Sequence, residues 1–572
     1  MLKDIYSEKV QYLDDEPIKI MVEYTELTKN EIEVSVWHFS SLVLSICQPI
    51  IDREYDPDNS TQATQAVEQI CQTEISLPPL PAGGYGIQAK IGSNGVWSEQ
   101  IGTAVSVITR NSEQRILRYG FLSDFDQDDM DDEDIRSLRK YHINTIQYYD
   151  WSYRPHQLVG PETCYQDLMG KAINQDVLSY KIDRAHALGM RSIAYGAVYA
   201  AANDFLAAHP DWGLLDHSGK PIRFIDCFCI MDISRGCPWH EHIIDQYKQS
   251  IMKLHFDGIH MDTYGHPKWA ISPSHGKKTI YLEDHFDVLI NDVRDSLKTV
   301  KPEATLIFNN VGNWPIEKTA KARQDCVYIE VWPPYERYHH ISQLILDGQK
   351  FSGGKPVILA AYLAPFRTGT AAGAQYAALL LTAIIFGHGG THLLLGEKDG
   401  VLTQGYYVDH SLLNPLQSHA LRQYYDFGVQ YQDLLYDHEL LDVTMTHSFW
   451  DNVEYRCTNM PWSPYGESGK LYLTIRQKPN WRTISMVNLC GCSNDYWNTD
   501  KECPIQLENV IFEVMLDGSC PSVWLASPDD DGQPISLPYQ LFETEKGLFA
   551  RIIVPKIKIW ALLVISCEQE PI

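Results

Sequence analysis

Positive charge is scarce in this sequence, in which 47 Lys and Arg residues stand against 74 Asp and Glu residues. The resulting formal net charge of −27 repels the phosphate backbone of nucleic acids. No run of Lys and Arg with interleaved aromatic residues is present to offset that repulsion. We therefore expect no nucleic-acid partner.

Long apolar runs are missing as well. The most apolar stretch, 371–390, is rich in small residues and is interrupted by Gln375, Tyr376 and Thr382. This pattern predicts a buried helix and not a membrane span. We therefore expect no membrane partner.

A secretory signal is not evident near the N-terminus, because the first 20 residues hold neither an apolar region nor a small-residue cleavage site. The 13 Cys residues are odd in number and follow no repeating framework, which is typical of a reducing compartment. Both features predict a cytoplasmic protein. A leader removed ahead of the first residue would leave the same pattern.

Motifs that hold nucleotide cofactors are absent too. No Walker loop, dinucleotide fingerprint or G-x-S-x-G elbow lies between a predicted strand and a predicted helix. Cys227, Cys229, Cys237 and His240 have only loosely zinc-like spacing, and free thiols in a Pro- and Gly-rich loop explain them better. We expect no cofactor and no metal ion.

The acidic run 124–134 does not meet the requirements of a calcium loop. Carboxylates stand at alternate positions in it, but Asp129 occupies the place of the required Gly and Ile135 that of the final Glu. Acidic residues ahead of a helix interact favourably with its dipole. The run therefore predicts a solvated N-terminal cap for a helix over 135–141.

Aromatic residues, by contrast, are abundant, with 33 Tyr and 14 Trp. Their rings stack well on the apolar faces of sugars, and they also serve as core and interface anchors. The sequence as a whole has globular composition, with 44% apolar and 21% charged residues. Its 572 residues exceed what a single core usually supports, so two to four domains are expected.

The periodicity divides the chain into three regions. Short alternating segments predict an N-terminal immunoglobulin-like β-sandwich in residues 1–112 and a C-terminal antiparallel β-sandwich domain in residues 436–572. Between them, residues 113–435 alternate strand-like runs with helical stretches. The fold class predicted is a multidomain protein with a central (β/α)8 TIM barrel and two flanking β-domains.

Eight strand-like runs support the barrel, and helical segments separate them. The runs are 118–125, 143–151, 191–199, 258–265, 305–312, 327–332, 356–363 and 391–397. The active sites of such barrels lie at the carboxyl ends of the strands. Polar residues that follow these runs are therefore the first candidates for a functional site.

Asp262 lies at the end of the fourth run, in the sequence MDTYG. A carboxylate here is positioned to attack an anomeric carbon, with His260 and Tyr264 as neighbouring donors. The alternative is a structural role, because an Asp after a strand also accepts hydrogen bonds from loop amides.

Glu330 lies at the end of the sixth run, beside Val331, Trp332 and two prolines. Surroundings that exclude water raise the pKa of a carboxyl, which suits a general acid. A buried salt bridge with Arg337 or Lys355 is the alternative. Two carboxyls that face one pocket are the minimum equipment for cleaving a glycosidic bond.

Four short motifs resemble glycoside hydrolase family 66, the dextranases and cycloisomaltooligosaccharide glucanotransferases. They are YGFLSDF at 119–125, NTIQYYDWSYR at 144–154, GIHMDTYG at 258–265 and YIEVWPP at 328–334. The resemblance implies a retaining, double-displacement mechanism on α-1,6-linked glucan. It makes Asp262 the nucleophile and Glu330 the acid/base, and it implies no metal.

Retention also makes a geometric prediction, that the two carboxyl groups lie about 5–6 Å apart. The resemblance further implies that Asp150, beside Trp151 after the second run, holds glucose hydroxyls, with an ion pair to Arg154 as the alternative. Polar strand ends also hydrogen-bond one another, so the remaining substrate-binding candidates are weaker. These are Asp124, Trp151, His260, Tyr264, Asn310, Trp332 and Glu397.

The expected activity is endo-hydrolysis of dextran or isomaltooligosaccharides, and cytoplasmic location favours short imported oligosaccharides. Transglycosylation or cyclisation is the rival within the family, and a non-catalytic glucan-binding protein is a further alternative. The cyclising members of the family look to carry a large module inserted in the barrel. The longest barrel loop here lies between the third and fourth runs and has about 60 residues. This difference favours hydrolysis.

Overall fold

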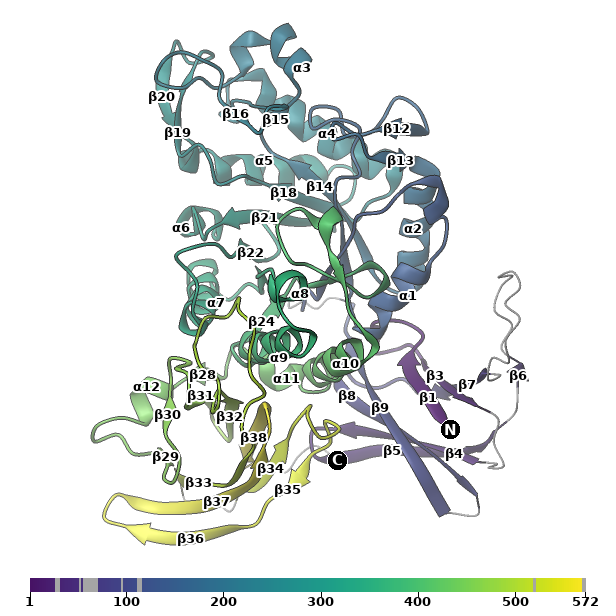
Figure 1. Ribbon diagram of the computed structural model, residues 1–572, viewed down its shortest axis with the longest axis vertical. Coiled ribbons are helices and arrows are strands. Elements are labelled where there is room, and N and C mark those ends of the chain that lie inside the picture. Colours follow the sequence, from purple (N-terminus) through teal and green to yellow (C-terminus); the bar gives the residue numbers. More distant parts are fainter. Residues whose placement is uncertain are drawn as a thin grey trace.

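The chain is a multidomain, β-rich protein built around one large curled sheet (Figure 1). The computed structural model describes residues 1–25, 31–50, 53–54, 70–93, 96–110, 116–517 and 521–567. The predicted boundary at residues 112–113 lies outside the described residues. No helix in the described ranges is long and apolar enough to cross a membrane.

Two sheets form the N-terminal region. One has the order β1-β3-β7-β6 and the other β2-β9-β8-β4-β5. Side chains alternate between buried and half-buried along β3, so Ile18, Ile20 and Val22 face a core shared with Val34 of β4. The strands are β1 (Leu2–Ser7), β2 (Tyr12–Leu13), β3 (Ile18–Thr25), β4 (Glu31–His38), β5 (Ser41–Pro49), β6 (Arg53–Glu54), β7 (Ile70–Leu77), β8 (Gly83–Ser93) and β9 (Val96–Ile108).

The curled sheet contains eight strands that pair in parallel, each with the next along the chain. Each lies within one of the eight predicted runs, or begins one residue before it. They are β10 (Tyr119–Leu122), β11 (Thr145–Tyr148), β14 (Arg191–Ala197), β18 (Gly258–Asp262), β21 (Thr305–Val311), β22 (Val327–Glu330), β23 (Val357–Ala360) and β24 (Gly390–His392).

The eighth run is split in two and contacts both ends of this series. β24 pairs with β23, and β25 (Leu395–Gly396) pairs in parallel with β10 through Gly396 and Phe121. Two short antiparallel strands, β26 (Gly400–Val401) and β27 (Ser411–Leu412), extend the sheet beyond β25.

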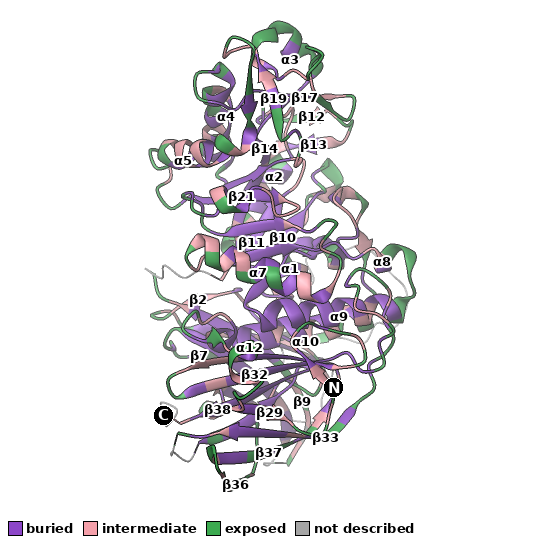
Figure 2. Cartoon of the chain, turned by 90° about the vertical axis from the view of Figure 1, so that its left-hand side faces the viewer, coloured by how far each residue is buried: buried purple, intermediate pink, exposed green. Residues whose placement is uncertain are grey.

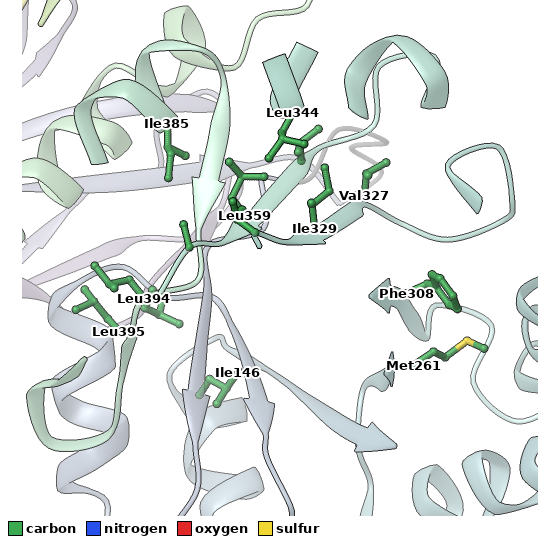
Figure 3. Close-up of a cluster of buried hydrophobic side chains, with 14 of the residues drawn as sticks. Ile146, Met261, Phe308, Val327, Ile329, Leu344, Leu359, Ile385, Leu394 and Leu395 are labelled. Carbon is green, nitrogen blue, oxygen red and sulfur yellow. The ribbon is translucent and has the colours of Figure 1, made fainter. Parts of the chain in front are cut away.

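Helices cover the outer face of the curled sheet. Met261, Phe308 and Ile329 point from their strands toward this layer, where Leu344 of α7 and Ile385 of α9 also lie (Figure 3). The predicted buried helix forms as α9 and has apolar residues all round, because it packs against α7, α10 and β24. The main helices are α1 (Glu133–Lys140), α2 (Gln175–Ala187), α4 (Pro238–Leu254), α5 (Phe286–Leu297), α7 (Tyr338–Ser352), α9 (Ala371–Gly387) and α10 (Pro415–Gln430).

Since successive strand residues point to opposite faces, the neighbours of those outward residues point into the curl. The inner face forms its own apolar cluster, rich in tyrosine, with Tyr119, Tyr328, Tyr362 and Tyr407. The eight parallel strands of the curled sheet are buried along most of their length, whereas α3 (Asn203–Ala208) is largely exposed (Figure 2).

The C-terminal region again has two sheets, one of which contains β31-β32-β38-β34 and the other β29-β33-β37-β36. The alternating segment 549–565, one of those from which the C-terminal β-domain was predicted, forms two strands, because the chain turns after Ile557 and β37 and β38 enter different sheets. The strands are β29 (Tyr455–Cys457), β31 (Leu471–Lys478), β32 (Trp481–Asn488), β33 (Leu507–Met515), β34 (Ser522–Ala526), β36 (Tyr539–Thr544), β37 (Gly547–Ile557) and β38 (Trp560–Ser566).

Candidate active site

A cavity of about 530 Å³ lies at the carboxyl ends of the curled sheet's strands. Six of the ten predicted site residues line it, contributed by the ends of three strands and the loops that follow them: Asp150, His260, Asp262, Tyr264, Glu330 and Trp332. Its size is that of a typical small-molecule site.

Asp262 is the last residue of β18 and is almost fully buried. Tyr195 Oη donates to its Oδ2 at 2.7 Å, and Asn309 Nδ2 donates to its Oδ1 at 2.7 Å. The donors predicted from the sequence, His260 and Tyr264, are not its partners. Both oxygens are therefore held by neutral donors from the neighbouring strands β14 and β21.

Glu330 is the last residue of β22, the second strand along from β18. Tyr362 Oη donates to its Oε1 at 2.9 Å. The predicted alternative, a salt bridge, is not formed: Arg337 pairs with Asp495, and Lys355 donates to the carbonyls of Ala320 and Ala322. Within the described part of the chain, Glu330 has no ion-pair partner.

One amide joins the two carboxyls. Asn309 Nδ2 donates to Asp262 Oδ1 at 2.7 Å and to Glu330 Oε2 at 3.2 Å. The two oxygens cannot be farther apart than these two bonds laid end to end. That limit applies to the nearest pair of oxygens, and the carboxyl groups of inverting glycosidases stand about 6.5–9.5 Å apart.

Burial is the largest cause of the raised pKa values of this pair. It raises the pKa of Asp262 to about 7, and the charge of Glu330 adds to the rise. Burial also raises the pKa of Glu330, opposed by the hydrogen bonds from Tyr362, Asn309 and Trp332. Because each ionised carboxyl disfavours the other, the pair holds one shared proton in a window below pH 7.

His260 lies two residues before Asp262 on β18, on the same inner face but deeper in the sheet. Its Nδ1 is 3.2 Å from Tyr119 Oη, and its ring lies edge-on to Tyr328 at 4.7 Å. Burial lowers the pKa of His260 to about 3. The ring is therefore neutral and packs beneath the carboxyls.

Asp150 follows β11 in a left-handed backbone conformation, with φ of 47°. Burial raises the pKa of its carboxyl to about 7, opposed by the Lys171 ammonium. The alternative pair with Arg154 is not formed, since Arg154 donates to the carbonyls of Tyr153 and Gln166. Asp150 is thus a cavity-lining acid.

Aromatic rings border the cavity on two sides. Phe224 stacks on Tyr264 with ring centroids 4.1 Å apart and planes 15° from parallel. Trp332 is 39% exposed and meets Tyr362 edge-on at 5.9 Å. Flat rings of this kind offer stacking faces for the apolar side of a sugar.

Four predicted residues do not line the cavity. Asn310 points to the opposite face of β21 from Asn309, where it donates to the Tyr328 carbonyl and accepts from Thr319. Trp151 is fully buried on the outer side, donating to the Tyr195 carbonyl at 3.0 Å.

The other two, Asp124 and Glu397, meet each other away from the cavity. Glu397 accepts from the Asp124 amide at 3.2 Å and from the backbone and hydroxyl of Ser123. It therefore ties the end of β10 to the segment after β25. Asp124 itself is exposed.

Several lining residues are not among the ten predicted site residues. Tyr195, Asn309 and Tyr362 supply the donors to the two carboxyls. Gly405 comes from the segment after β26, and a Cβ there would lie 3.3 Å from Glu330 Oε1. The sequence signal for Asn309 was its position at the end of a predicted strand. Gly405 had no such signal in the sequence.

The cysteines and histidine with loosely zinc-like spacing do not gather around a common point. Cys229 donates to Asn203, whereas His240 contacts the Ile233 carbonyl and Asp292. Among the described residues no group of three or more His, Cys, Asp or Glu side chains is arranged to hold a metal ion. The acidic run caps a short helix at Gln127–Asp129 and begins α1.

Comparison with known proteins identifies the family. The sequence profile of glycosyl hydrolase family 66 matches residues 8–564. The chain is 20% identical, over 718 aligned residues, to a cycloisomaltooligosaccharide glucanotransferase of Niallia circulans, covering 98% of this chain and 71% of that protein. It is 23% identical over 383 residues to a dextranase of Streptococcus salivarius, covering 57% of this chain and 46% of the dextranase.

A solved structure has the same fold. The cycloisomaltooligosaccharide glucanotransferase of Paenibacillus sp., in complex with cycloisomaltoheptaose, superposes with a TM-score of 0.86 at 18% identity. The superposition covers 98% of this chain and 99% of the solved one. As the four motifs predicted, the chain belongs to glycosyl hydrolase family 66 and is a glycoside hydrolase.

Proposed function

We propose that this enzyme cleaves internal α-1,6-glucosidic linkages of dextran or isomaltooligosaccharides with retention of anomeric configuration. The observation that carries the proposal is the pair of carboxyls, buried Asp262 and half-buried Glu330, held by one amide and by no cation of the described chain. Relatives named dextranase and cycloisomaltooligosaccharide glucanotransferase support the choice of substrate.

In the first step, Asp262 attacks the anomeric carbon and forms a covalent glycosyl-enzyme ester. Glu330 donates its proton to the departing glycosidic oxygen, so the leaving chain departs as a neutral alcohol. In the second step, Glu330 removes a proton from water, whose oxygen displaces Asp262 from the same carbon. Two displacements restore the original configuration.

The spacing of the carboxyls supports retention over inversion. Both touch the same Asn309 nitrogen, which leaves no room between their nearest oxygens for the water that an inverting enzyme places there. Tyr195 and Asn309 donate to Asp262 and so stabilise its ionised form, the form that a nucleophile needs.

Sugar binding is assigned to the remaining lining residues. Asp150 faces the cavity without an ion-pair partner among the described residues, which suits it to accept hydrogen bonds from glucose hydroxyls. Trp332 and Tyr264 supply stacking faces. His260 lies beneath the carboxyls and is assigned to supporting them.

For the fold, we propose that the curled sheet is a closed (β/α)8 barrel. The pairing of β24 with β23 and of β25 with β10 supports closure through the run 390–396. We further propose the domain boundaries 1–112, 113–435 and 436–572, with an immunoglobulin-like first domain.

Glycosyl transfer is the second candidate, because the relative that aligns over most of this chain is named a glucanotransferase. A sugar hydroxyl then replaces water in the second step. The segment between β14 and β18 is short and consists of a small three-stranded sheet, α3 and α4, which favours hydrolysis.

One incubation with linear dextran and one with isomaltotetraose separate these outcomes. We expect linear isomaltooligosaccharides from both, with the shorter substrate turned over faster because the enzyme is expected to act on short oligosaccharides. Predominantly cyclic products would overturn the hydrolase assignment. A strong preference for high-molecular-weight dextran would overturn the preference for short substrates.

We expect kcat/KM to fall as the pH rises through about 7, where the Asp262–Glu330 pair loses its last proton. Glu330 then has no proton to donate. At lower pH the rate falls again once both carboxyls are protonated and the nucleophile is neutral. A pH profile on isomaltotetraose measures both limbs, and a flat profile across pH 6–9 would contradict the shared proton.

A further inference from the structure

The loop between β32 and β33 leaves the C-terminal sheets and reaches the curled sheet near α7 and α9 (Figure 1). Residues 495–500 of this loop, named the brace below, make its principal contacts there. They lie well over 100 residues after Glu330 in the sequence. No residue of the brace lines the cavity.

The first contact of the brace is with the segment that follows Glu330. Trp497 is buried, its Nε1 donates to the Tyr335 carbonyl at 2.7 Å, and its amide donates to the Glu336 carbonyl at 3.1 Å. The Asp495 carbonyl accepts from the Tyr338 amide at 3.1 Å. This segment begins with Trp332 at the cavity edge, and Tyr335 closes a turn onto the Trp332 carbonyl.

Charge reinforces that contact. Arg337 pairs with the Asp495 carboxylate, and its guanidinium lies over the Tyr496 ring at 4.4 Å. A planar guanidinium that is both paired and stacked loses little further freedom on binding. The segment after Glu330 is thus held by backbone and side-chain bonds together.

The second contact is with the segment that follows Tyr362. Asn498 Oδ1 accepts from the Ala364 amide at 2.8 Å, and Asp500 Oδ2 accepts from the Thr370 amide at 2.9 Å. Gly369 leaves room for that carboxylate, since a Cβ there would lie 1.8 Å from Asp500 Oδ1. The segment is therefore shaped to receive the brace.

The two braced segments carry the two partners of one hydrogen bond. Tyr362 Oη donates to Glu330 Oε1 at 2.9 Å, yet the strands β22 and β23 run only as far as Glu330 and Ala360. In the described chain, the last backbone bond between these segments joins the Val331 amide to the Ala360 carbonyl. Beyond it, the brace is the element bonded to both.

We propose that the brace is a positioning element of the active site, which fixes Glu330 and Tyr362 relative to each other and so governs proton delivery to the leaving group. The proposal rests on the proposed role of Glu330. The C-terminal region then takes part in catalysis through geometry and without touching the substrate. Misplacement of a reacting group by about 1 Å costs up to about 100-fold in rate.

The test uses the full-length enzyme and three variants. Asn498→Ala removes the acceptor for the Ala364 amide, whereas Asn498→Asp keeps an acceptor oxygen there. Asn459→Ala is the matched control, because Asn459 is also exposed and accepts from the Ile511 amide at 2.8 Å within the C-terminal sheets. Each is assayed on isomaltotetraose and on isomaltosyl fluoride, whose fluoride departs with little need for a proton.

We expect Asn498→Ala to lower kcat/KM for isomaltotetraose by about 10-fold and to leave kcat/KM for the fluoride within about 2-fold of wild type. Asn498→Asp and Asn459→Ala are expected to match wild type on both substrates. An equal loss on the two substrates would show that the brace supports the structure in general and does not govern proton delivery, which would overturn the proposal. Wild-type rates for Asn498→Ala would overturn the proposal outright.

Failure of the brace and failure of the proposed function give different results. If Glu330→Gln turns over isomaltotetraose normally, the role of Glu330 is wrong and the brace has no proton delivery to govern. If Glu330→Gln is inactive while Asn498→Ala is normal, the function stands and the brace alone is refuted.

Discussion

Asp262→Asn is expected to lower turnover of isomaltotetraose by about 10⁴-fold, while binding of the substrate is retained. The amide keeps the shape of the side chain and a partner for Tyr195 or Asn309, but it cannot form the covalent ester. Single-turnover kinetics measure the loss, and binding measured by calorimetry shows that the cavity is intact. Near-normal turnover would reject Asp262 as the nucleophile.

A stability measurement separates this loss from misfolding. The pKa of Asp262 is raised to about 7 in the folded chain, against about 3.9 for an unperturbed Asp, so ionisation disfavours the folded state. The wild type therefore loses stability as the pH rises from about 4 to about 7, and Asp262→Asn loses less. We expect the variant to unfold at a higher temperature than wild type at pH 8 and at a similar one at pH 4.

Glu330→Gln is expected to lower kcat/KM for isomaltotetraose by about 10³-fold and kcat/KM for isomaltosyl fluoride far less. The amide has no acidic proton for a sugar leaving group, whereas fluoride leaves without one. In the wild type, the alkaline limb of the pH profile reports the loss of the shared proton. We expect this limb to be absent when the substrate is the fluoride, because fluoride leaves without a proton. Steady-state rates on the two substrates across pH 5–9 measure both effects.

Glu397→Gln is the matched control for this experiment. Glu397 is also a buried carboxyl at the end of a strand of the curled sheet, with a raised pKa, but it lies outside the cavity. We expect it to show no difference between the two substrates. If Glu330→Gln lowered kcat/KM for the fluoride and for the oligosaccharide to the same extent, Glu330 would not be the general acid.

The strands of the curled sheet were predictable because each is a short buried run with helical sequence on either side. A carboxyl that ends such a run is conspicuous, and Asp262 and Glu330 were found in this way. The alternating strands of the N-terminal and C-terminal sheets were equally legible. The split of 549–565 was not, because Ile557 and Trp560 on either side of the turn are both apolar and conceal it.

The direction of a side chain at a strand end was harder to predict than the strand itself. Asn309 and Asn310 are adjacent, and only the register of β21 decides which one faces the carboxyls. Trp151 follows Asp150, whose left-handed backbone turns the chain so that the ring packs on the outer side. Neither outcome is encoded in the identity of the residue concerned.

Contacts between segments that are far apart in the sequence could not be predicted, for a different reason. Tyr362 lies 32 residues from the carboxyl it contacts, and Trp497 lies 162 residues from the carbonyl it contacts. Such pairs depend on how whole strands and domains are arranged in space. The hydrophobic pattern within either segment carries no information about the other.

Three tyrosine hydroxyls inside the curled sheet form a row of hydrogen bonds that begins at Glu330. A phenol carries a single proton, so when Tyr362 donates to Glu330 it accepts from Tyr407, 3.3 Å away, and Tyr407 accepts from Tyr328, 3.1 Å away. A Glu330 protonated on Oε1 can instead donate to Tyr362, and the three hydroxyls can then turn and point the other way. The orientation of this row of hydroxyl dipoles, which runs into the core of the protein, therefore depends on the charge state of Glu330.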